Sequence, residues 1–308
     1  MTIIIPTHLP SLDLALGGGI EGKSIYLVHG PGGAGKTQLL FWFVVAVLRV
    51  GGSVFWIETD GFPVLRLLEV VKAQGIQDGI ALNNLHVREV RTLDAQERGV
   101  EAACLRADAN HRSFGLVVVD SFTGTFRQSL GTAHERESLE SVGMQMSALR
   151  EVTRAPRIAV AVSGQVWTDF ETGRTRPIGE RTLDGWPDVT IRIDRRQNGD
   201  RAVTVDRRGT GIQEVSLRIA AEGLREVVPH VAGRGHPSAD GEQHGCAPTQ
   251  PAWKRKDAPV PAVVVQVIDQ VPITITDGTT LSPGAIVSLD PQEAQKLIDN
   301  GQARRWGT

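Results

Sequence analysis

The residues best suited to do chemistry lie in a glycine-rich loop with the spacing Gly-x4-Gly-Lys-Thr. A glycine-rich backbone can turn its N–H groups toward phosphate oxygens, and the N-terminus of a following helix adds positive potential. Lys36 then reaches the β- and γ-phosphates, and the hydroxyl of Thr37 binds Mg²⁺. This pattern predicts an ATP and Mg²⁺ site. Its nucleotide-binding residues are Gly30, Pro31, Gly32, Gly33, Ala34, Gly35, Lys36, Thr37 and Gln38.

A carboxylate for the same site follows the apolar run Leu116-Val-Val-Val-Asp120. Such a run is typical of a strand buried on both faces of a sheet. Asp120 would then stand at the carboxyl edge of the sheet, beside the glycine-rich loop, where open α/β sheets bind ligands. We expect Thr37 and Asp120 to organise the Mg²⁺ ion, Asp120 through water, with Ser121 supporting the site.

Hydrolysis of ATP also needs a group that orients or deprotonates the attacking water. Two acids qualify, Glu58 and Asp60, because they end the strand candidate 53–59 and share one face of it if the strand extends that far. The choice between them stays open. Gln165 follows a later strand and could sense the γ-phosphate through its amide, although it could equally be a plain polar strand end.

The elements around these residues alternate between strand and helix over the first half of the chain. This alternation predicts an α/β fold with right-handed crossovers and a mostly parallel central sheet. The expected strands are 24–29, 53–59, 85–90, 114–120 and 158–163, and the expected helices are 37–49, 63–74, 94–111 and 135–154.

From Val189 the pattern changes to alternating strands, which we expect to be antiparallel and to close the sheet edge. The first domain is expected to cover residues 1–228. Residues 229–261 are rich in Gly, Pro, His and Ser without periodicity, which favours a flexible linker. Residues 262–308 are expected to form a small β-rich module of ββα type, with a helix that ends at Gly301.

Composition limits the classes of function. The formal net charge of -2 gives no global attraction to nucleic acid, so any such contact must be a local patch. The chain has 2 cysteines, Cys104 and Cys246, too few for a disulfide framework. No secretion signal and no apolar run of membrane-spanning length is visible, so we expect a soluble cytoplasmic protein. His230, His236, His244 and Cys246 match no compact zinc spacing.

Several segments, in order and spacing, resemble the RecA/RadA recombinases, and among these the archaeal RadB-type paralogues most closely. The resemblance covers roughly residues 8 to 228 and is far more specific than any single motif. The segments that carry it are 12–22, the glycine-rich loop, 56–61, 118–121, 126–127, 164–166, 183–188 and 218–224.

The resemblance implies a RecA-like P-loop NTPase core, ATP bound by the glycine-rich loop, and Gln165 as sensor. It also implies two loops that face single-stranded DNA, 124–135 and 169–186, on which Trp167, Phe170 or Trp186 would stack against bases. The alternative is a pair of solvated basic loops with core aromatics. The candidate DNA-binding residues are Arg127, Arg136, Arg174, Arg176 and Arg181.

Two departures shape the expected function. Asp60 stands where active recombinases of this family carry the catalytic glutamate, one methylene longer, so turnover would be lower or Glu58 would take over. The N-terminal segment used for polymerisation is not evident, which favours an accessory or mediator role in recombination and repair, with a homo-oligomer or a recombinase as partner. The alternative is a regulatory ATPase of the related circadian-clock branch that acts on protein partners without binding DNA.

Overall fold

The computed structural model of the 308-residue chain describes the following residues: 2–77, 79, 83–109, 113–168, 175–177, 183, 185–227, 263–267, 273–274, 280–281, 286–289 and 291–305. The expected linker 229–261, with its three histidines and Cys246, lies outside these residues, so its flexibility stays a prediction. The division into domains is likewise a prediction.

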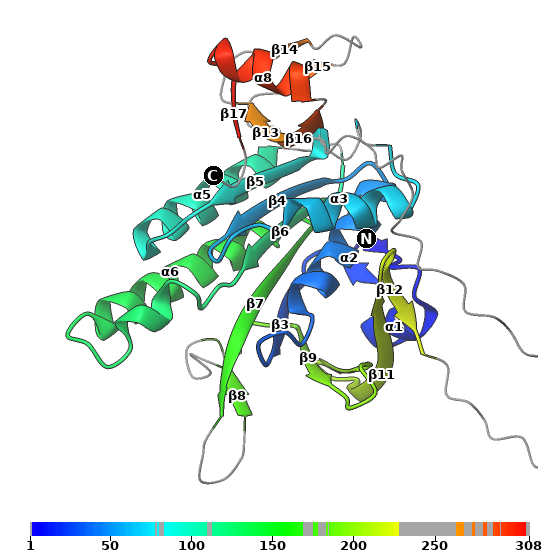
Figure 1. Cartoon of the computed structure of the whole chain (residues 1–308). Coiled ribbons are helices and arrows are strands. Elements are labelled where there is room, and N and C mark those ends of the chain that lie inside the picture. The colour runs from blue at the N-terminus through cyan, green and yellow to red at the C-terminus, as the bar shows by residue number, and fades with distance from the viewer. Residues whose placement is uncertain are drawn as a thin grey trace, which may run out of the picture.

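A ten-stranded sheet forms the centre of the molecule, with the order β12-β11-β10-β9-β3-β7-β6-β4-β5 and with β8 paired to β7 (Figure 1). The middle strands are parallel, and β9 to β12 continue the sheet in antiparallel fashion, as the sequence predicts. The parallel strands are β3 (Ile25–Gly30), β4 (Ser53–Glu58), β5 (Leu85–Glu89), β6 (Gly115–Asp120), β7 (Ile158–Thr168) and β9 (Val189–Arg195). The others are β8 (Thr175–Pro177), β10 (Arg201–Arg207), β11 (Gly211–Ala220) and β12 (Gly223–Glu226).

Helices cover both faces of this sheet (Figure 1). On one face α1 (Pro10–Leu16), α2 (Lys36–Arg49) and α3 (Val64–Ala73) pack against the sheet in a large hydrophobic cluster. On the other face α5 (Leu93–Ala109) and α6 (Glu135–Val152) form a second cluster. Helix α2 buries ten consecutive residues, Leu39 to Leu48, which explains its apolar sequence without a membrane. The predicted α/β class is confirmed.

The N-terminal segment contains elements that the sequence did not suggest. Strands β1 (Ile4–Ile5) and β2 (Ile20–Glu21) form a two-stranded sheet around α1. Asp13 accepts hydrogen bonds from the backbone N–H groups of Thr7 at 2.7 Å and His8 at 3.1 Å, and Gly17 ends the helix in the left-handed region at φ 82°. These elements are too short to give a periodic pattern, which is why they escaped prediction.

The C-terminal residues form a separate small sheet of order β16-β13-β17 and a two-stranded hairpin. The helix α8 (Pro291–Asp299) is where the sequence predicts it, but a third strand follows it, so the module is not simply ββα. The strands are β13 (Val263–Val267), β14 (Ile273–Thr274), β15 (Thr280–Leu281), β16 (Ile286–Leu289) and β17 (Ala303–Arg305).

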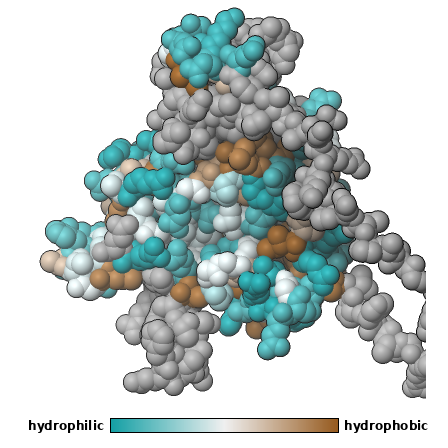
Figure 2. All heavy atoms as spheres, viewed as in Figure 1, coloured by the Kyte–Doolittle hydropathy of each residue, from teal (hydrophilic) through white to brown (hydrophobic). Residues whose placement is uncertain are grey.

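No helix among the described residues is long and apolar enough to cross a membrane. On the face seen in Figure 2, hydrophobic residues form separate small patches among hydrophilic ones. Scattered apolar side chains of this kind are normal on a protein surface.

Candidate nucleotide-binding site

The predicted site residues meet because their strands are parallel neighbours. Strands β3, β7, β6 and β4 lie side by side in the sheet, so their carboxyl ends share one edge. The P-loop (residues 30–37) follows β3, Glu58 ends β4, and Asp120 ends β6, with Asp120 and Glu58 directly opposite in register. Gln165 lies opposite Gly30, but within β7 rather than just past it, because that strand continues to Thr168.

The P-loop passes close to neighbouring strands at its two ends and is open in its middle. A Cβ on Gly30 would lie 2.3 Å from the carbonyl oxygen of Ile193, whereas a Cβ on Gly32 or Gly33 would meet nothing within 4 Å. Gly35 has a φ of 109°, in the left-handed region that favours glycine, and directly precedes α2. The glycines therefore allow close backbone approach at the two ends of the loop and leave its middle open.

The hydrogen-bond donors of the P-loop are arranged to suit a polyphosphate ligand. Among the described residues, no protein oxygen accepts a hydrogen bond from the backbone N–H of Gly32, Gly33 or Gly35. The ammonium group of Lys36 donates to the carbonyl oxygens of Gly30 at 2.9 Å and Pro31 at 3.1 Å, inside the same loop. Free N–H groups, a helix N-terminus and a lysine together favour an anionic ligand with several phosphates.

Thr37 and Asp120, the predicted Mg²⁺ residues, are hydrogen-bonded to each other. The Thr37 hydroxyl donates to Asp120 Oδ2 at 2.7 Å, and the buried Ser163 hydroxyl donates to Asp120 Oδ1. Burial raises the pKa of Asp120, while the two hydroxyls and the nearby Lys36 ammonium oppose that shift. Within the described residues no three His, Cys, Asp or Glu side chains cluster, so a Mg²⁺ ion here would take its other ligands from phosphate and water.

The two candidate bases occupy different environments. Glu58 is 3% exposed, and its carboxylate accepts hydrogen bonds from Trp56 Nε1 at 3.0 Å and from the backbone N–H of Asp60 at 2.9 Å. Burial, and then the neighbouring Asp120 carboxylate, raise the pKa of Glu58 to about 7. Asp60 lies beyond the end of β4 and is exposed. The extension of the strand that would put both acids on one face is absent.

Gln165 connects Asp60 to the first predicted DNA loop. Its Nε2 is 3.5 Å from Asp60 Oδ2, and its Oε1 accepts a hydrogen bond from Arg127 Nη1. Arg127 is exposed and belongs to the 3-10 turn Phe126–Ser129. The backbone N–H of Gln165 donates to the hydroxyl of Thr123 at 3.2 Å, so the same loop also holds the strand. The chain of contacts thus runs from a surface cation to a carboxylate at the P-loop edge.

The structure describes only some of the other candidate DNA-binding residues. Arg136 is highly exposed and pairs with Glu140 at 3.0 Å on the same helix. Arg176 lies in β8, paired in register with Trp167. Trp186 packs against the second hydrophobic cluster, which fits a core role better than base stacking. Arg174, Arg181 and Phe170 lie outside the described residues.

Sequence reasoning missed several residues that shape the site. Ser163 could have been found, because it ends the predicted strand next to Asp120. His29, directly before the P-loop, is half-buried, and burial followed by the charge of Arg192 lowers its pKa to about 4, so it is neutral at pH 7. Arg201 donates from Nε to the P-loop carbonyl of Ala34 at 2.6 Å, a contact across 167 positions that no local motif signals.

The fold and the site together define a P-loop protein with a RecA-type sheet. A family model described as Rad51 matches residues 1–225 of the chain. Because that match covers most of its length, the chain belongs to the Rad51 family. This confirms the resemblance to the RecA/RadA recombinases.

Proteins named DNA repair and recombination protein RadB are similar to this chain. The protein from Halobacterium salinarum is 32% identical over 205 residues, covering 64% of this chain and 85% of the relative. The protein from Pyrococcus horikoshii is 30% identical over 200 residues, covering 65% and 83%. The protein from Methanoculleus marisnigri is 29% identical over 205 residues, covering 65% and 87%. The RadB-type resemblance is therefore confirmed, and the comparisons give no support to the circadian-clock alternative.

Proposed function

We propose that this chain is an ATP- and Mg²⁺-dependent protein of DNA recombination and repair that binds single-stranded DNA and acts as an accessory or mediator. The names of its relatives support the process. The observation that carries the proposal is the chain of contacts Asp60–Gln165–Arg127. It connects a carboxylate beside the P-loop to a cation on the loop expected to face DNA. Nucleotide state can therefore bias a DNA-facing side chain.

In this proposal different residues bind the phosphates, hold Mg²⁺ and act on the attacking water. The P-loop N–H groups and Lys36 bind the phosphates, Lys36 by leaving the carbonyls of Gly30 and Pro31. A bound Mg²⁺ would offset charge on the β- and γ-phosphate oxygens, held by Thr37 and through water by Asp120. Asp60 orients and deprotonates the attacking water, while Glu58, whose oxygens are already occupied, fixes the backbone at Asp60.

The length and exposure of the Asp60 side chain lead us to expect slow ATP hydrolysis. Its carboxylate is one methylene shorter than the glutamate expected at this position, and it is exposed to solvent. An exposed, short carboxylate holds a water molecule less firmly than a buried one on a longer side chain. Nucleotide binding is thus better supported than fast hydrolysis, which suits a protein whose loops respond to bound ATP. Assembly with further copies or with a recombinase remains a prediction.

The hydrogen bond between Arg127 and Gln165 is the contact through which both ligands would act. When DNA phosphate binds the guanidinium, Gln165 Oε1 loses its donor and the amide is free to turn toward a γ-phosphate. When the γ-phosphate holds Gln165, Arg127 is released toward DNA. By reciprocity, ATP and DNA then raise each other's affinity.

The test is a titration of a fluorescent single-stranded oligonucleotide by anisotropy, without nucleotide, with ADP, and with a non-hydrolysable ATP analogue, across salt concentrations. We expect tighter binding with the analogue and an affinity that falls with salt. Arg127→Ala should abolish the difference between nucleotides. Arg136→Ala should keep it, because Arg136 is an exposed cation of helix α6 that pairs with Glu140 on the same helix. An affinity that ignores both the γ-phosphate and salt would contradict the proposal.

A further inference from the structure

Arg201 extends the P-loop site to a strand far away in the sequence. It begins β10, and its Nε donates to the carbonyl oxygen of Ala34 at 2.6 Å. Its Nη1 donates to the carbonyl of Gly199 and lies 3.5 Å from that of Asp200. One guanidinium therefore bridges the P-loop and the β9–β10 hairpin.

The contact with Ala34 determines the direction of a phosphate-binding group. In a trans peptide the C=O and N–H bonds point in opposite directions. Because the oxygen of Ala34 points to Arg201, the N–H of Gly35 on the same peptide points away from β10. That N–H has no protein acceptor among the described residues. Arg201 thus holds one donor of the cradle in its outward-facing position.

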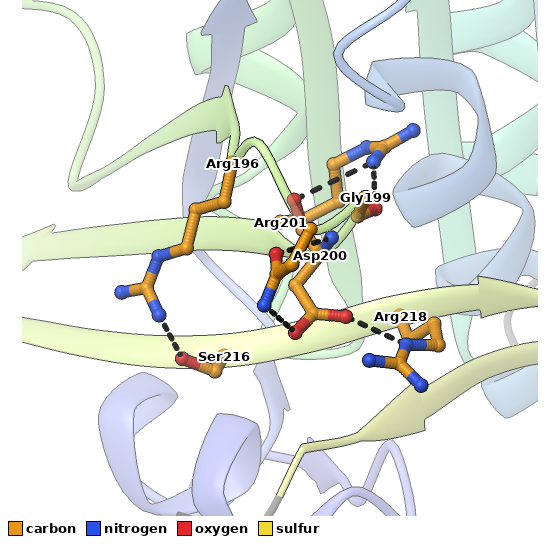
Figure 3. Close-up of polar contacts among 7 residues, drawn as sticks. Arg196, Gly199, Asp200, Arg201, Ser216 and Arg218 are labelled. Atoms are coloured by element: carbon orange, nitrogen blue, oxygen red, sulfur yellow. Dashed lines mark hydrogen bonds and ion pairs between the residues drawn. The ribbon is translucent and has the colours of Figure 1, made fainter.

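The hairpin that presents Arg201 is held by its own polar network, shown in Figure 3. The Asp200 carboxylate is 3% exposed and accepts from Arg218 Nε at 2.6 Å and from Asn198 Nδ2 at 2.8 Å. Since Asp200 is turned toward Arg218, no carboxylate forms an ion pair with Arg201 in the described part of the chain. Arg196 points toward Ser216, away from the Arg201 guanidinium (Figure 3).

Side chains from β10 and β11 pack against the same part of the P-loop. A Cβ on Gly35 would lie 2.9 Å from Ile219 Cδ1 and 3.5 Å from Arg201 Nε. Arg201 and Ile219 also line a small apolar pocket with Gly35 and Leu39 of the loop and helix α2. The antiparallel extension of the sheet therefore forms an outer wall of the cradle.

We propose that Arg201 is a positioning residue for nucleotide phosphates: it fixes the Ala34–Gly35 peptide so that the Gly35 N–H meets the phosphate. The inference rests on the proposed binding of ATP and deepens it. Arg201 acts through the backbone and touches no reacting atom. Its loss should therefore weaken nucleotide binding while leaving the turnover of bound ATP in place.

The test compares Arg201→Gln, Arg201→Lys and the matched control Arg196→Gln in the full chain, by titration with ADP and a non-hydrolysable ATP analogue and by steady-state hydrolysis. Arg201→Gln should raise Kd and KM about tenfold, the effect expected when a charged hydrogen-bond donor is lost, with kcat changed less than about threefold. Lysine keeps a cationic donor, whereas glutamine keeps only a neutral one, so Arg201→Lys should recover Kd to within about threefold of the wild-type value. Arg196→Gln should stay within about twofold.

Equal Kd values for Arg201→Gln and Arg196→Gln would overturn the inference, as would a lysine variant no better than glutamine. If Arg201→Gln loses its native circular dichroism, Arg201→Met, which keeps the aliphatic stem in the apolar pocket but has no donor, takes its place. If the wild-type chain binds nucleotide and Arg201→Gln does not change the affinity, the inference fails but the proposed function stands. A wild-type chain that binds none overturns both.

Discussion

At the level of single residues, Glu58 and Asp60 differ in what surrounds their carboxylates. Both oxygens of Glu58 already accept hydrogen bonds, from Trp56 and from the backbone of Asp60, and the side chain is buried. A base must reach the water that it activates, and burial together with two hydrogen bonds places the Glu58 carboxylate less well for this than an exposed one. Asp60 is exposed and lies near the amide of Gln165. We therefore propose that Asp60 acts on the water and that Glu58 supports the backbone at Asp60.

Substitutions at the two acids should separate these roles. Asp60→Asn should lower single-turnover ATP hydrolysis about 100-fold or more, the usual contribution of a general base, with nucleotide affinity within about threefold. Glu58→Gln keeps an acceptor for the Asp60 N–H and should lower hydrolysis less than about tenfold. Lys36→Ala is the control that loses nucleotide binding itself. Hydrolysis that survives in Asp60→Asn but is lost in Glu58→Gln would reverse the assignment.

The sequence predicted the site residues whose roles follow from a local motif and missed those that depend on distant strands. The P-loop, Thr37 and Asp120 are readable because chemistry requires their types at the carboxyl ends of buried strands. Arg201 is not, because its role depends on where β10 lies in the sheet. Nor could the sequence choose between Glu58 and Asp60, since strand β4 ends between them.

At the level of elements, a buried polar network connects the two helices of one face to the loop after β6. Gln96 of α5 is 0% exposed, and its Nε2 donates to the carbonyl of Phe122 at 3.0 Å and to Gln145 Oε1 of α6 at 3.0 Å. Its Oε1 accepts from the Thr125 hydroxyl at 2.7 Å. The network fixes the start of the loop that carries Arg127. Periodicity predicts the helices but cannot predict which polar residues are buried between them.

Removing Gln96 should lower the stability of the chain and make this loop more mobile. Gln96→Leu removes the acceptor of the Thr125 hydroxyl and the donor to Gln145 Oε1, which we expect to lower the free energy of unfolding by about 1 to 3 kcal/mol. Urea denaturation measures the change, and amide exchange over residues 121–130 should accelerate. Glu101→Gln, an exposed substitution on the same helix, should stay within about 0.5 kcal/mol. Equal stability of the two variants would show that the network does not hold the loop.

At the level of the whole molecule, the described residues that form the nucleotide site all lie in the part that matches the Rad51 family. The strands that deliver the P-loop, Glu58, Asp120 and Gln165 precede residue 170, and the outer wall from β10 and β11 ends at Ala220. The C-terminal strands β13, β16 and β17 pair with one another and not with the central sheet. The division into domains stays a prediction from the change of composition, and strand β17 is an element that the sequence did not suggest.

A chain ending at residue 228 should therefore keep its nucleotide site. We expect such a fragment to bind ADP and a non-hydrolysable ATP analogue within about twofold of the full chain, because no described P-loop contact involves a later residue. Calorimetric titration of both proteins measures the affinities, and circular dichroism checks that the fragment is folded. The control is the same fragment with Lys36→Ala, which should bind neither nucleotide. A folded fragment that has lost affinity tenfold would mean that residues 229–308 contribute directly to the site.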